Sequence, residues 1–241
     1  MSDIELTPEA FAQLKKENSK LKLEANLRRS LSTQLEKQKK IADEAKKEAQ
    51  EKSAELEVLS AKLAKYLSPQ IYEQIFSGHQ DANVTSQRKK LTIFFSDIVG
   101  FTDITEHLES EELTSLINFY LNEMSMITLK YGGTIDKYIG DAILIFFGDP
   151  ESKGYKEDAS SCIKMAIEMQ NKMRELTDVW GKNFGLKSAL SIRIGINTGF
   201  CTVGNFGSDN RLDYTVIGSP VNLASRLEST AQPNNIIVSE E

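Results

Sequence analysis

The sequence of 241 residues contains few cysteines and few histidines. It contains two cysteines, Cys162 and Cys201, and two histidines, His79 and His107. Two cysteines without a framework spacing do not indicate a disulfide scaffold. No stretch combines a basic start, an apolar run and a small-residue cleavage site, as a secretory signal would. These absences favour a reducing compartment, and we expect the chain in the cytoplasm or in the cytosolic part of a larger receptor.

Long apolar runs and a large excess of positive charge are also missing. No apolar run approaches the roughly 20 residues that a membrane-spanning helix needs, so we expect no membrane span. Lysine and arginine number 29 against 35 aspartates and glutamates, which gives a net charge of -6 and argues against wholesale nucleic-acid binding but not against a local basic cleft. A hydrophobic content of 40% is enough for the core of one ordinary domain with an appendage.

Glycine is absent between about Thr7 and Leu67, and the only proline in that stretch, Pro8, follows a threonine as at a helix start. This pattern predicts one long helix. Four of its apolar residues have the a and d spacing of a heptad: Leu56, Leu59, Leu63 and Tyr66. The register weakens further back, which leaves two readings open. We favour a parallel two-stranded coiled coil over a solvated, partly frayed helix, because a polar helix of this length buries little alone.

The remainder alternates between strand and helix patterns. The helix ends near Pro69, because the residue before a proline avoids the helical region. Strands are predicted at 91–96, 134–139, 142–147, 190–197, 200–203, 213–217 and 236–238, with 200–203 as the hairpin partner of 190–197. Helices are predicted at 111–130, 158–176 and 221–228. This order predicts a mainly antiparallel sheet covered by helices on one face, an α+β fold. We expect a helix over 1–67, a linker over 68–90 and a globular domain over 91–241.

Two aspartates lie where an apolar strand gives way to glycine. Asp97 is followed by the turn Ile98-Val99-Gly100, and Asp141 directly follows Gly140. A carboxylate at a strand end beside a flexible turn can approach a phosphate-bound cation, whereas one inside an apolar run would be buried at a cost of several kcal/mol. The placement therefore indicates a metal site near phosphate.

The turn after Asp97 has two readings of equal weight. Its backbone N–H groups, at Gly100, Phe101 and Thr102, can hold phosphate oxygens while Asp97 and the Ile98 carbonyl hold the cation. The alternative is an ordinary turn between strand and helix, capped by an aspartate.

Two further segments carry polar side chains in suggestive places. Lys137 lies four residues before Asp141 in the predicted hairpin. Asn222 and Arg226 follow the strand that carries Thr215, and their i, i+4 spacing places them on one helical face, where they can converge on one ligand. Taken singly, an Asn and Arg pair bound to nearby surface acids is the commoner reading.

Together the three segments resemble the class III nucleotidyl cyclases, the adenylate and guanylate cyclases. The resemblance spans roughly Leu91 to Glu241 and rests on motifs that match in order and spacing. The motifs are the segment around Asp97, the run Gly-Gly-Thr-Ile-Asp-Lys-Tyr-Ile-Gly-Asp that ends at Asp141, and the run Tyr-Thr-Val-Ile-Gly with Asn222 and Arg226 after it. The preceding helix, with its segment 65–69, resembles the coiled-coil linker that joins a sensor to such a domain, and the linker 68–90 resembles a cyclase transducer.

The resemblance implies a ferredoxin-like, palm-type sheet and the conversion of ATP to cyclic AMP and pyrophosphate. It implies that two Mg²⁺ or Mn²⁺ ions are held by oxygen ligands, the kind that these cations prefer. In this resemblance the roles fall as follows: Asp97, Ile98 and Asp141 on the metals, Gly100, Phe101 and Thr102 on phosphate, Lys137 and Thr215 on adenine, Asn222 on the ribose and Arg226 on the transition state.

The resemblance also implies a homodimer with shared active sites, formed through the catalytic domain and the N-terminal helix, and an upstream sensor or partner. Family members continue through further sheet, so we expect the domain to be truncated after Glu241. Three alternatives stay open: a guanylate cyclase, a catalytically weak cyclase-like module, and a coiled-coil interaction protein. A phosphodiesterase is disfavoured, because its metal sites need more than two histidines.

Overall fold

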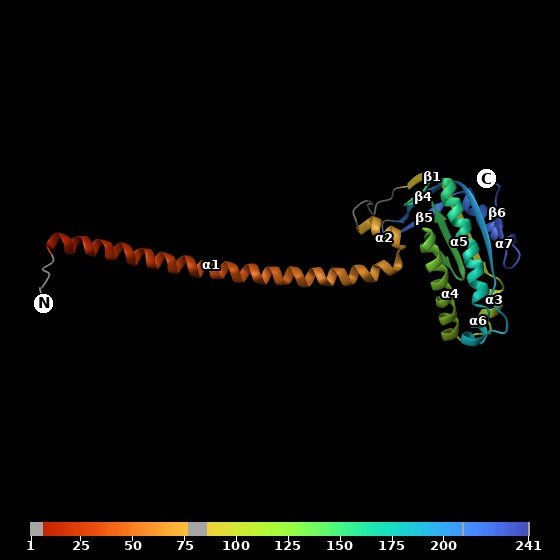
Figure 1. The fold of residues 1–241 in the computed structure, drawn as a ribbon, viewed down its shortest axis with the longest axis horizontal. Coiled ribbons are helices and arrows are strands. Elements are labelled where there is room, and N and C mark those ends of the chain that lie inside the picture. The colour runs from red at the N-terminus through yellow and green to blue at the C-terminus, as the bar shows by residue number, and fades with distance from the viewer. Residues whose placement is uncertain (1–6, 77–85, 209, 241) are drawn as a thin grey trace. The chain divides into compact units, whose positions relative to one another are not determined.

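The computed structural model describes residues 7–76, 86–208 and 210–240, and it divides into two compact units, Met1–Leu63 and Ala64–Glu241. Figure 1 labels most of the elements. The helices are α1 (Pro8–Leu63), the 3₁₀ turn η1 (Ala64–Tyr66), α2 (Pro69–Phe76), α3 (Phe101–Thr105), α4 (Ser110–Tyr131), α5 (Tyr155–Glu175), α6 (Thr177–Phe184) and α7 (Ser219–Thr230). The strands are β1 (Ser86–Ile98), β2 (Thr134–Ile139), β3 (Ala142–Phe147), β4 (Ile192–Ser208), β5 (Arg211–Ile217) and β6 (Ile236–Val238).

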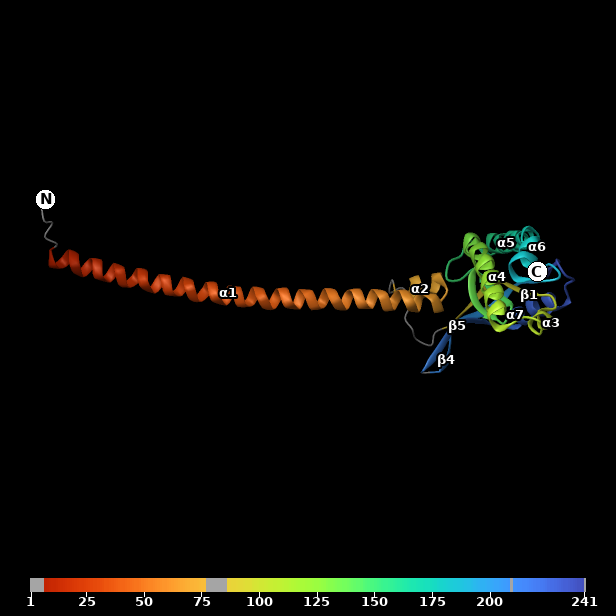
Figure 2. The same ribbon diagram turned by 90° about the horizontal axis from the view of Figure 1, so that it is seen from below.

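The first unit is the single long helix α1, 56 residues in length, which runs without a break in Figures 1 and 2. It begins at Pro8 as predicted, and the Thr7 hydroxyl accepts a hydrogen bond from the Ala10 N–H at 3.4 Å. None of its described residues is buried, and the apolar seam predicted at its C-terminal end is exposed. The long helix is confirmed, and its pairing into a coiled coil stays a prediction.

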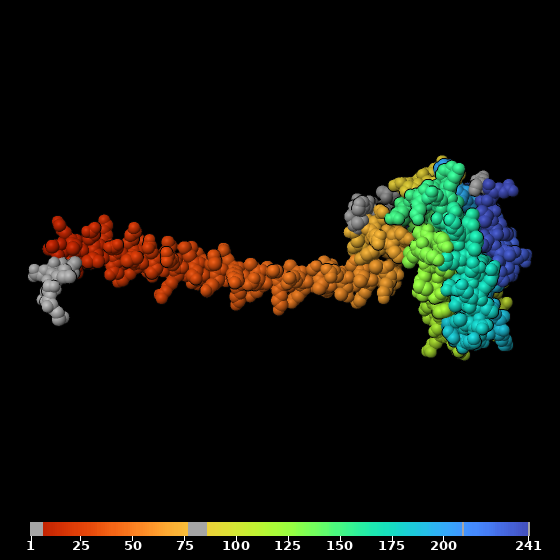
Figure 3. All heavy atoms as spheres, viewed as in Figure 1, coloured from red at the N-terminus to blue at the C-terminus, as the bar shows by residue number. Residues whose placement is uncertain are grey.

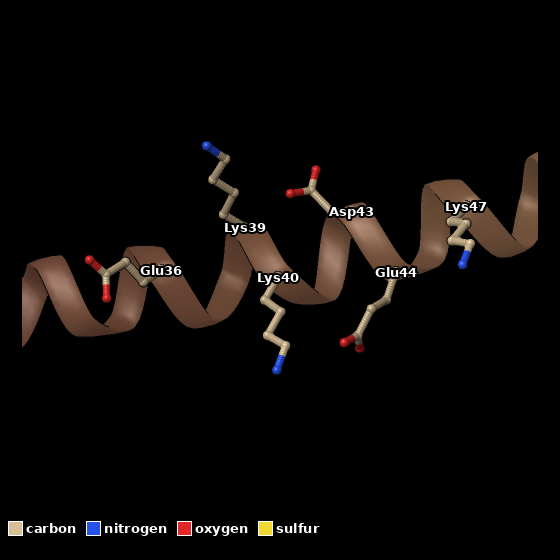
Figure 4. Close-up of a pocket in the computed structure, with 6 residues that line it drawn as sticks. All are labelled: Glu36, Lys39, Lys40, Asp43, Glu44 and Lys47. Atoms are coloured by element: carbon tan, nitrogen blue, oxygen red, sulfur yellow. The ribbon is translucent and has the colours of Figure 1, made fainter.

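Charged side chains cover the middle of α1. Figure 4 shows six of them pointing to different sides of the helix: Glu36, Lys39, Lys40, Asp43, Glu44 and Lys47. Further along, Lys52 and Glu48 form an i, i+4 ion pair at 2.8 Å. Exposed pairs of this kind stabilise a helix by only about 0.3–0.5 kcal/mol each. This surface keeps α1 hydrated and does not enclose a ligand site.

The segment after α1 belongs to the second unit. The helical geometry tightens at η1 and stops before Pro69, which starts α2. Gln70 Nε2 donates to the Gly133 carbonyl at 2.9 Å, and Ile71 is buried, so α2 is fixed to the globular part. Of the predicted linker 68–90, residues 77–85 lie outside the described residues.

The second unit is built on one six-stranded sheet in the order β2-β3-β1-β4-β5, with β6 pairing with β4 as well. Every pairing is antiparallel except that of β4 with β6. The predicted hairpin 134–139/142–147 is present as β2 and β3. The helix before it, α4, ends at Gly132, whose positive φ of 79° suits a residue without a side chain. The predicted α+β, mainly antiparallel fold is confirmed.

One predicted hairpin is wrong. Residues 190–197 and 200–203 do not fold back on each other, because residues 192–208 form the single strand β4. The strand β1 extends back to Ser86 and pairs with β4 along its whole length, from Ser86 opposite Gly204 to Ile98 opposite Ile192. Thr198 and Gly199, which looked like a turn, therefore continue the ladder. Such a long partner is not visible from local sequence.

Helices cover both faces of the sheet, and the prediction of one covered face is wrong. Alternate residues of β1 enter two separate cores. Phe94 and Ile98 pack with residues of α4, α5 and α6, whereas Leu91 and Ile93 pack with Ala224 of α7. Figure 3 shows α4 and α5 on the face nearest the viewer, and Figure 2 shows α7 on the side opposite to α5 and α6.

The second face is closed by unusually tight contact between α7 and β4. A Cβ atom at Gly195 would lie 2.2 Å from both the Ala224 carbonyl oxygen and the Glu228 backbone nitrogen. A Cβ atom at Gly199 would lie 2.6 Å from Pro220 Cγ. The two glycines thus let α7 approach the strand backbone, which is why β4 is buried on both faces at this point.

In the described ranges, no helix is both long and apolar enough to cross a membrane. Cys162 and Cys201 are free and buried.

The close contact of Gly195 with α7 predicts that a single added methyl group destabilises the second unit. We expect Gly195→Ala to destabilise the second unit by about 1–3 kcal/mol or more, because backbone atoms on both elements would have to move. Thermal unfolding followed by circular dichroism measures this. The matched control is Gly181→Ala in α6, where a Cβ atom would lie 3.5 Å from its nearest neighbour and where helix propensity favours alanine. Equal melting temperatures for the two variants would contradict the proposed packing role.

Candidate functional site

The two predicted metal-binding aspartates lie together at one edge of the sheet. Asp97 is the penultimate residue of β1, and Asp141 lies in the turn between β2 and β3. The antiparallel pairing places Ser96 opposite Ile143, so the end of β1 reaches the turn that carries Asp141. Asp141 Oδ2 accepts a hydrogen bond from the Ile98 N–H at 3.0 Å. The structure therefore brings Asp97, Ile98 and Asp141 into one group.

The two carboxylates repel each other electrostatically. Burial, together with the hydrogen bond and negative charge of Asp97, raises the pKa of Asp141 to about 7. Two carboxylates that cannot both ionise freely are a fitting environment for a divalent cation, which removes the repulsion. The residues present thus fit the predicted metals.

The side-chain donors of this group are few. Across the described residues there is no cluster of three or more histidine, cysteine, aspartate or glutamate side chains that could hold a metal. A pair of carboxylates and one carbonyl suits Mg²⁺, which keeps several waters and is commonly bound by one or two carboxylates together with substrate phosphates.

Arg193 and Glu228 extend this group, and neither was predicted from the sequence. Arg193 lies opposite Asp97 in the pairing of β1 and β4, and its Nη2 atom donates to Asp97 Oδ2 at 2.9 Å. On its other side, Arg193 Nε lies 2.5 Å from Oε1 of Glu228, a buried residue of α7. In the sequence, Arg193 lies on the polar side of the alternating strand pattern at 190–197. That pattern predicts a side chain facing solvent and gives no indication of a neighbouring carboxylate.

The predicted phosphate-binding turn starts the short helix α3. Gly100 precedes α3 with a φ of 69°, a conformation that favours glycine, and a Cβ atom there would have no neighbour within 4 Å. Glycine is therefore required by the backbone and not by crowding. The turn lies directly after Ile98, so the N–H groups at Gly100, Phe101 and Thr102 follow the metal-binding group along the chain.

A second group gathers around Asp136, another residue that the sequence analysis did not select. Thr215 Oγ1 donates to Asp136 Oδ2 at 2.6 Å, and the Val216 N–H donates to the same oxygen at 3.2 Å. Lys137 Nζ lies 3.2 Å from Asp136 Oδ1. The structure thus brings the two predicted base-binding residues, Lys137 and Thr215, to the two oxygens of one buried carboxylate.

The last two predicted site residues lie on α7. Asn222 and Arg226 are both exposed, and neither side chain has an ion-pair or hydrogen-bond partner in the part of the chain that the structure describes. Over the same residues, no hydrogen bond or ion pair joins Asp97 or Asp141 to the group around Asp136. Within one chain, the predicted site residues therefore form separate groups.

Lys137 also borders a hollow of about 720 Å³. Its walls come from residues 64–69 and Ile71, from α4 and from strands β2 and β5. In α4, Ser125 Oγ lies 2.7 Å from the Tyr138 hydroxyl, next to Lys137 on β2. The segment that follows α1 therefore lies close to the strand that carries the predicted base-binding lysine.

Residues 84–241 match the family model of the adenylate and guanylate cyclase catalytic domain. The adenylate cyclase of Anabaena cylindrica is 33% identical over 183 residues, which cover 74% of this chain and 34% of that protein. An adenylate cyclase of Dictyostelium discoideum, specific to terminal differentiation, is 38% identical over 140 residues, 58% of this chain and 6% of that protein. The chain thus spans about a third or less of the length of these relatives.

The fold and the sequence both match solved cyclase structures. The adenylyl cyclase CyaB from P. aeruginosa is 57% identical with a TM-score of 0.63, over 65% of this chain and 80% of that one. The guanylyl cyclase Cya2 is 40% identical with a TM-score of 0.60, over 64% of this chain and 76% of that one. Since the family model covers well over half of the sequence, this chain belongs to the adenylate and guanylate cyclase catalytic domain family.

Proposed function

We propose that the chain is an adenylate cyclase that converts ATP to 3',5'-cyclic AMP and pyrophosphate. The observation that carries the choice of ATP is the position of Lys137 and Thr215 at the two oxygens of Asp136. Lysine donates a hydrogen bond, and ring N1 of adenine accepts one. In guanine N1 is itself a donor, so two donors would face each other unsatisfied. The similarity to adenylate cyclases supports the same choice.

The reaction forms a bond between the ribose 3'-oxygen and the α-phosphorus while the bond to pyrophosphate breaks and the hydroxyl loses its proton. In this proposal Asp97, Asp141 and the Ile98 carbonyl hold two Mg²⁺ or Mn²⁺ ions. When bound, such ions activate the attacking oxygen and stabilise the leaving phosphates. The N–H groups of Gly100, Phe101 and Thr102 hold phosphate oxygens.

The residues of α7 complete the site. The planar guanidinium of Arg226 suits phosphate oxygens, so it stabilises charge that develops on the phosphoryl group in the transition state. Asn222 lies one helical turn earlier and orients the ribose, which keeps the 3'-hydroxyl in line with the phosphorus. Both side chains are exposed and unpaired among the described residues, and so are available to a ligand.

We further propose a homodimer with two shared sites. Among the described residues, no hydrogen bond or ion pair joins the side chains of Asp97 and Asp141 to the predicted base-binding, ribose-binding and transition-state residues of the same chain. A two-fold interface brings the first group of one protomer to the others of its partner, and it does so twice. The exposed leucines of α1 would pair in parallel as a coiled coil and connect the catalytic domains to an upstream sensor. The free, buried thiols are in keeping with a reducing cytoplasm.

The metal-binding role is tested by Asp141→Asn. Asparagine retains an oxygen for the Ile98 N–H but loses the charge that holds a cation, so we expect cyclic AMP formation from ATP to fall by about 100-fold or more with either Mg²⁺ or Mn²⁺. The control is Asp178→Asn, which removes an exposed carboxylate of α6. Near-normal activity of Asp141→Asn would exclude this role, and an inactive wild-type chain would refute the proposed function.

Shared sites are tested by complementation. Asp97→Ala and Arg226→Ala should each be inactive as homodimers. A verified heterodimer contains one site with both defects and one site with neither, so we expect about half of the wild-type activity per dimer. Tandem affinity purification with two different tags isolates the heterodimer. The shared-site arrangement would be contradicted if both variants were active as homodimers, or if the heterodimer were as inactive as the two homodimers.

Base selection is tested by the pair Lys137→Glu and Thr215→Cys. A carboxylate at position 137 can accept from the guanine N1–H, whereas it repels the adenine N1 lone pair. We expect the double variant to turn over less ATP and relatively more GTP. Both rates are measured by separating the cyclic products chromatographically. An unchanged preference in the folded double variant would rule out this recognition scheme.

A further inference from the structure

Asp136 interrupts the pairing of β2 and β3. Ile135 pairs with Ile145 and Lys137 pairs with Leu144, so Asp136 is the extra residue of a β-bulge. Bulges re-aim a side chain and are frequent beside active sites. Here the carboxylate is fully buried, while the neighbouring Lys137 side chain is 39% exposed. The bulge therefore turns an acidic side chain inward and leaves the amine beside it accessible.

The carboxylate joins two strands that are not neighbours in the sheet. Its strand, β2, lies at one end of the order β2-β3-β1-β4-β5, and its two hydrogen-bond donors, Thr215 and Val216, lie on β5 at the other end. Asp136 Oδ2 accepts from both. Oδ1 is buried next to the Lys137 ammonium and accepts no hydrogen bond from any residue that the structure describes.

The charge of Asp136 follows from these neighbours. Burial raises the pKa of Asp136, and the Thr215 hydroxyl, the Lys137 ammonium and the Val216 N–H all oppose that rise. The ammonium and the N–H can only donate, so both favour the ionised carboxylate, which in turn can only accept hydrogen bonds.

Because the ionised Asp136 carboxylate can only accept hydrogen bonds, the Thr215 hydroxyl must donate to it. A hydroxyl has one proton to donate and lone pairs to accept with, so alone it can meet either purine. The proton of Thr215 is committed to Asp136 at 2.6 Å. Only the lone pairs are left for a ligand, and they suit the 6-amino group of adenine and not the 6-oxo group of guanine.

We propose that Asp136 determines base specificity by holding the Thr215 hydroxyl as a hydrogen-bond acceptor, so that the site receives adenine and rejects guanine. Asp136 is a positioning residue, since it acts through the Thr215 hydroxyl and does not itself contact the base. The inference rests on the proposed adenylate cyclase function and adds the residue that fixes its substrate.

The test compares kcat/KM for ATP and GTP in the 241-residue chain and its variants. Asp136→Ala removes the acceptor and frees the hydroxyl to donate, so we expect the ATP to GTP ratio to fall about tenfold. Asp136→Asn is the matched control, because its amide oxygen can still accept from Thr215 and Val216. We expect it to keep the ratio within about threefold of wild type. Should Asp136→Ala fail to fold, Asp136→Leu removes the acceptor and fills the space.

A double-mutant cycle separates specificity from structural support. In a Thr215→Val background there is no hydroxyl to orient, so adding Asp136→Ala should leave the ratio unchanged. If Asp136→Ala alone lowered kcat/KM for ATP and for GTP by the same factor, the role of Asp136 would be structural only. A ratio change of the same size in the Thr215→Val background would exclude the route through the hydroxyl.

Binding provides a second readout that does not depend on turnover. The affinities for 3'-deoxy-ATP and 3'-deoxy-GTP, which lack the attacking hydroxyl, should change in the same ratio as kcat/KM. If the wild-type chain binds 3'-deoxy-ATP selectively but forms no cyclic AMP, the proposed catalytic function fails while the role of Asp136 is still decided by its variants. If Asp136→Ala binds the two analogues with wild-type selectivity, the inference is wrong.

Discussion

The register of β1 between β3 and β4 is the constraint on which the rest of the unit depends. Ser96 lies opposite both Ile143 and Ile194, so a single strand end is fixed beside the hairpin turn and beside Arg193. That register places Asp97 near Asp141 and also distributes alternate residues of β1 between two cores. A slip of one residue would exchange the two faces and bury the wrong side chains. The same packing that stabilises the sheet therefore positions its carboxylates.

Local patterns predicted the elements that depend on local chemistry. The hairpin around Gly140 and the end of α4 at Gly132 follow from residues that accept a positive φ, and the sequence shows them directly. The continuous strand β4 depends instead on a partner about a hundred positions away, and the second covered face depends on the close approach of α7 to Gly195. Neither leaves a local signal. The partners Arg193, Glu228 and Asp136 were missed for the same reason, since only the fold brings them to residues that the motifs selected.

The chain separates its charges in a way that suits a shared site. Asp97 and Asp141 form an acidic group whose repulsion a cation would relieve, while Lys137 and Arg226 expose positive charge on other elements. Arg193 already pairs with Asp97 within one protomer, and further cations beside the aspartates would leave less negative charge for a metal. The proposed homodimer would keep the aspartates apart from Lys137 and Arg226 until two protomers associate, so that each group is free for its ligand. Catalysis would then depend on association.

Stability alone gives a weak account of Asp136. Burying a carboxylate costs several kcal/mol, and a buried ion pair often stabilises a fold no better than apolar residues of similar volume. Among the described residues, one oxygen accepts no hydrogen bond, and the lysine beside it is partly exposed, so the compensation is incomplete. What the carboxylate supplies that an apolar side chain cannot is a fixed direction for the Thr215 proton. A hydroxyl that can donate or accept discriminates poorly between adenine and guanine. A hydroxyl held as an acceptor can bind the 6-amino group of adenine but not the 6-oxo group of guanine, which is itself an acceptor. In the proposed adenylate cyclase, the cost of burying Asp136 is offset by selectivity for the base.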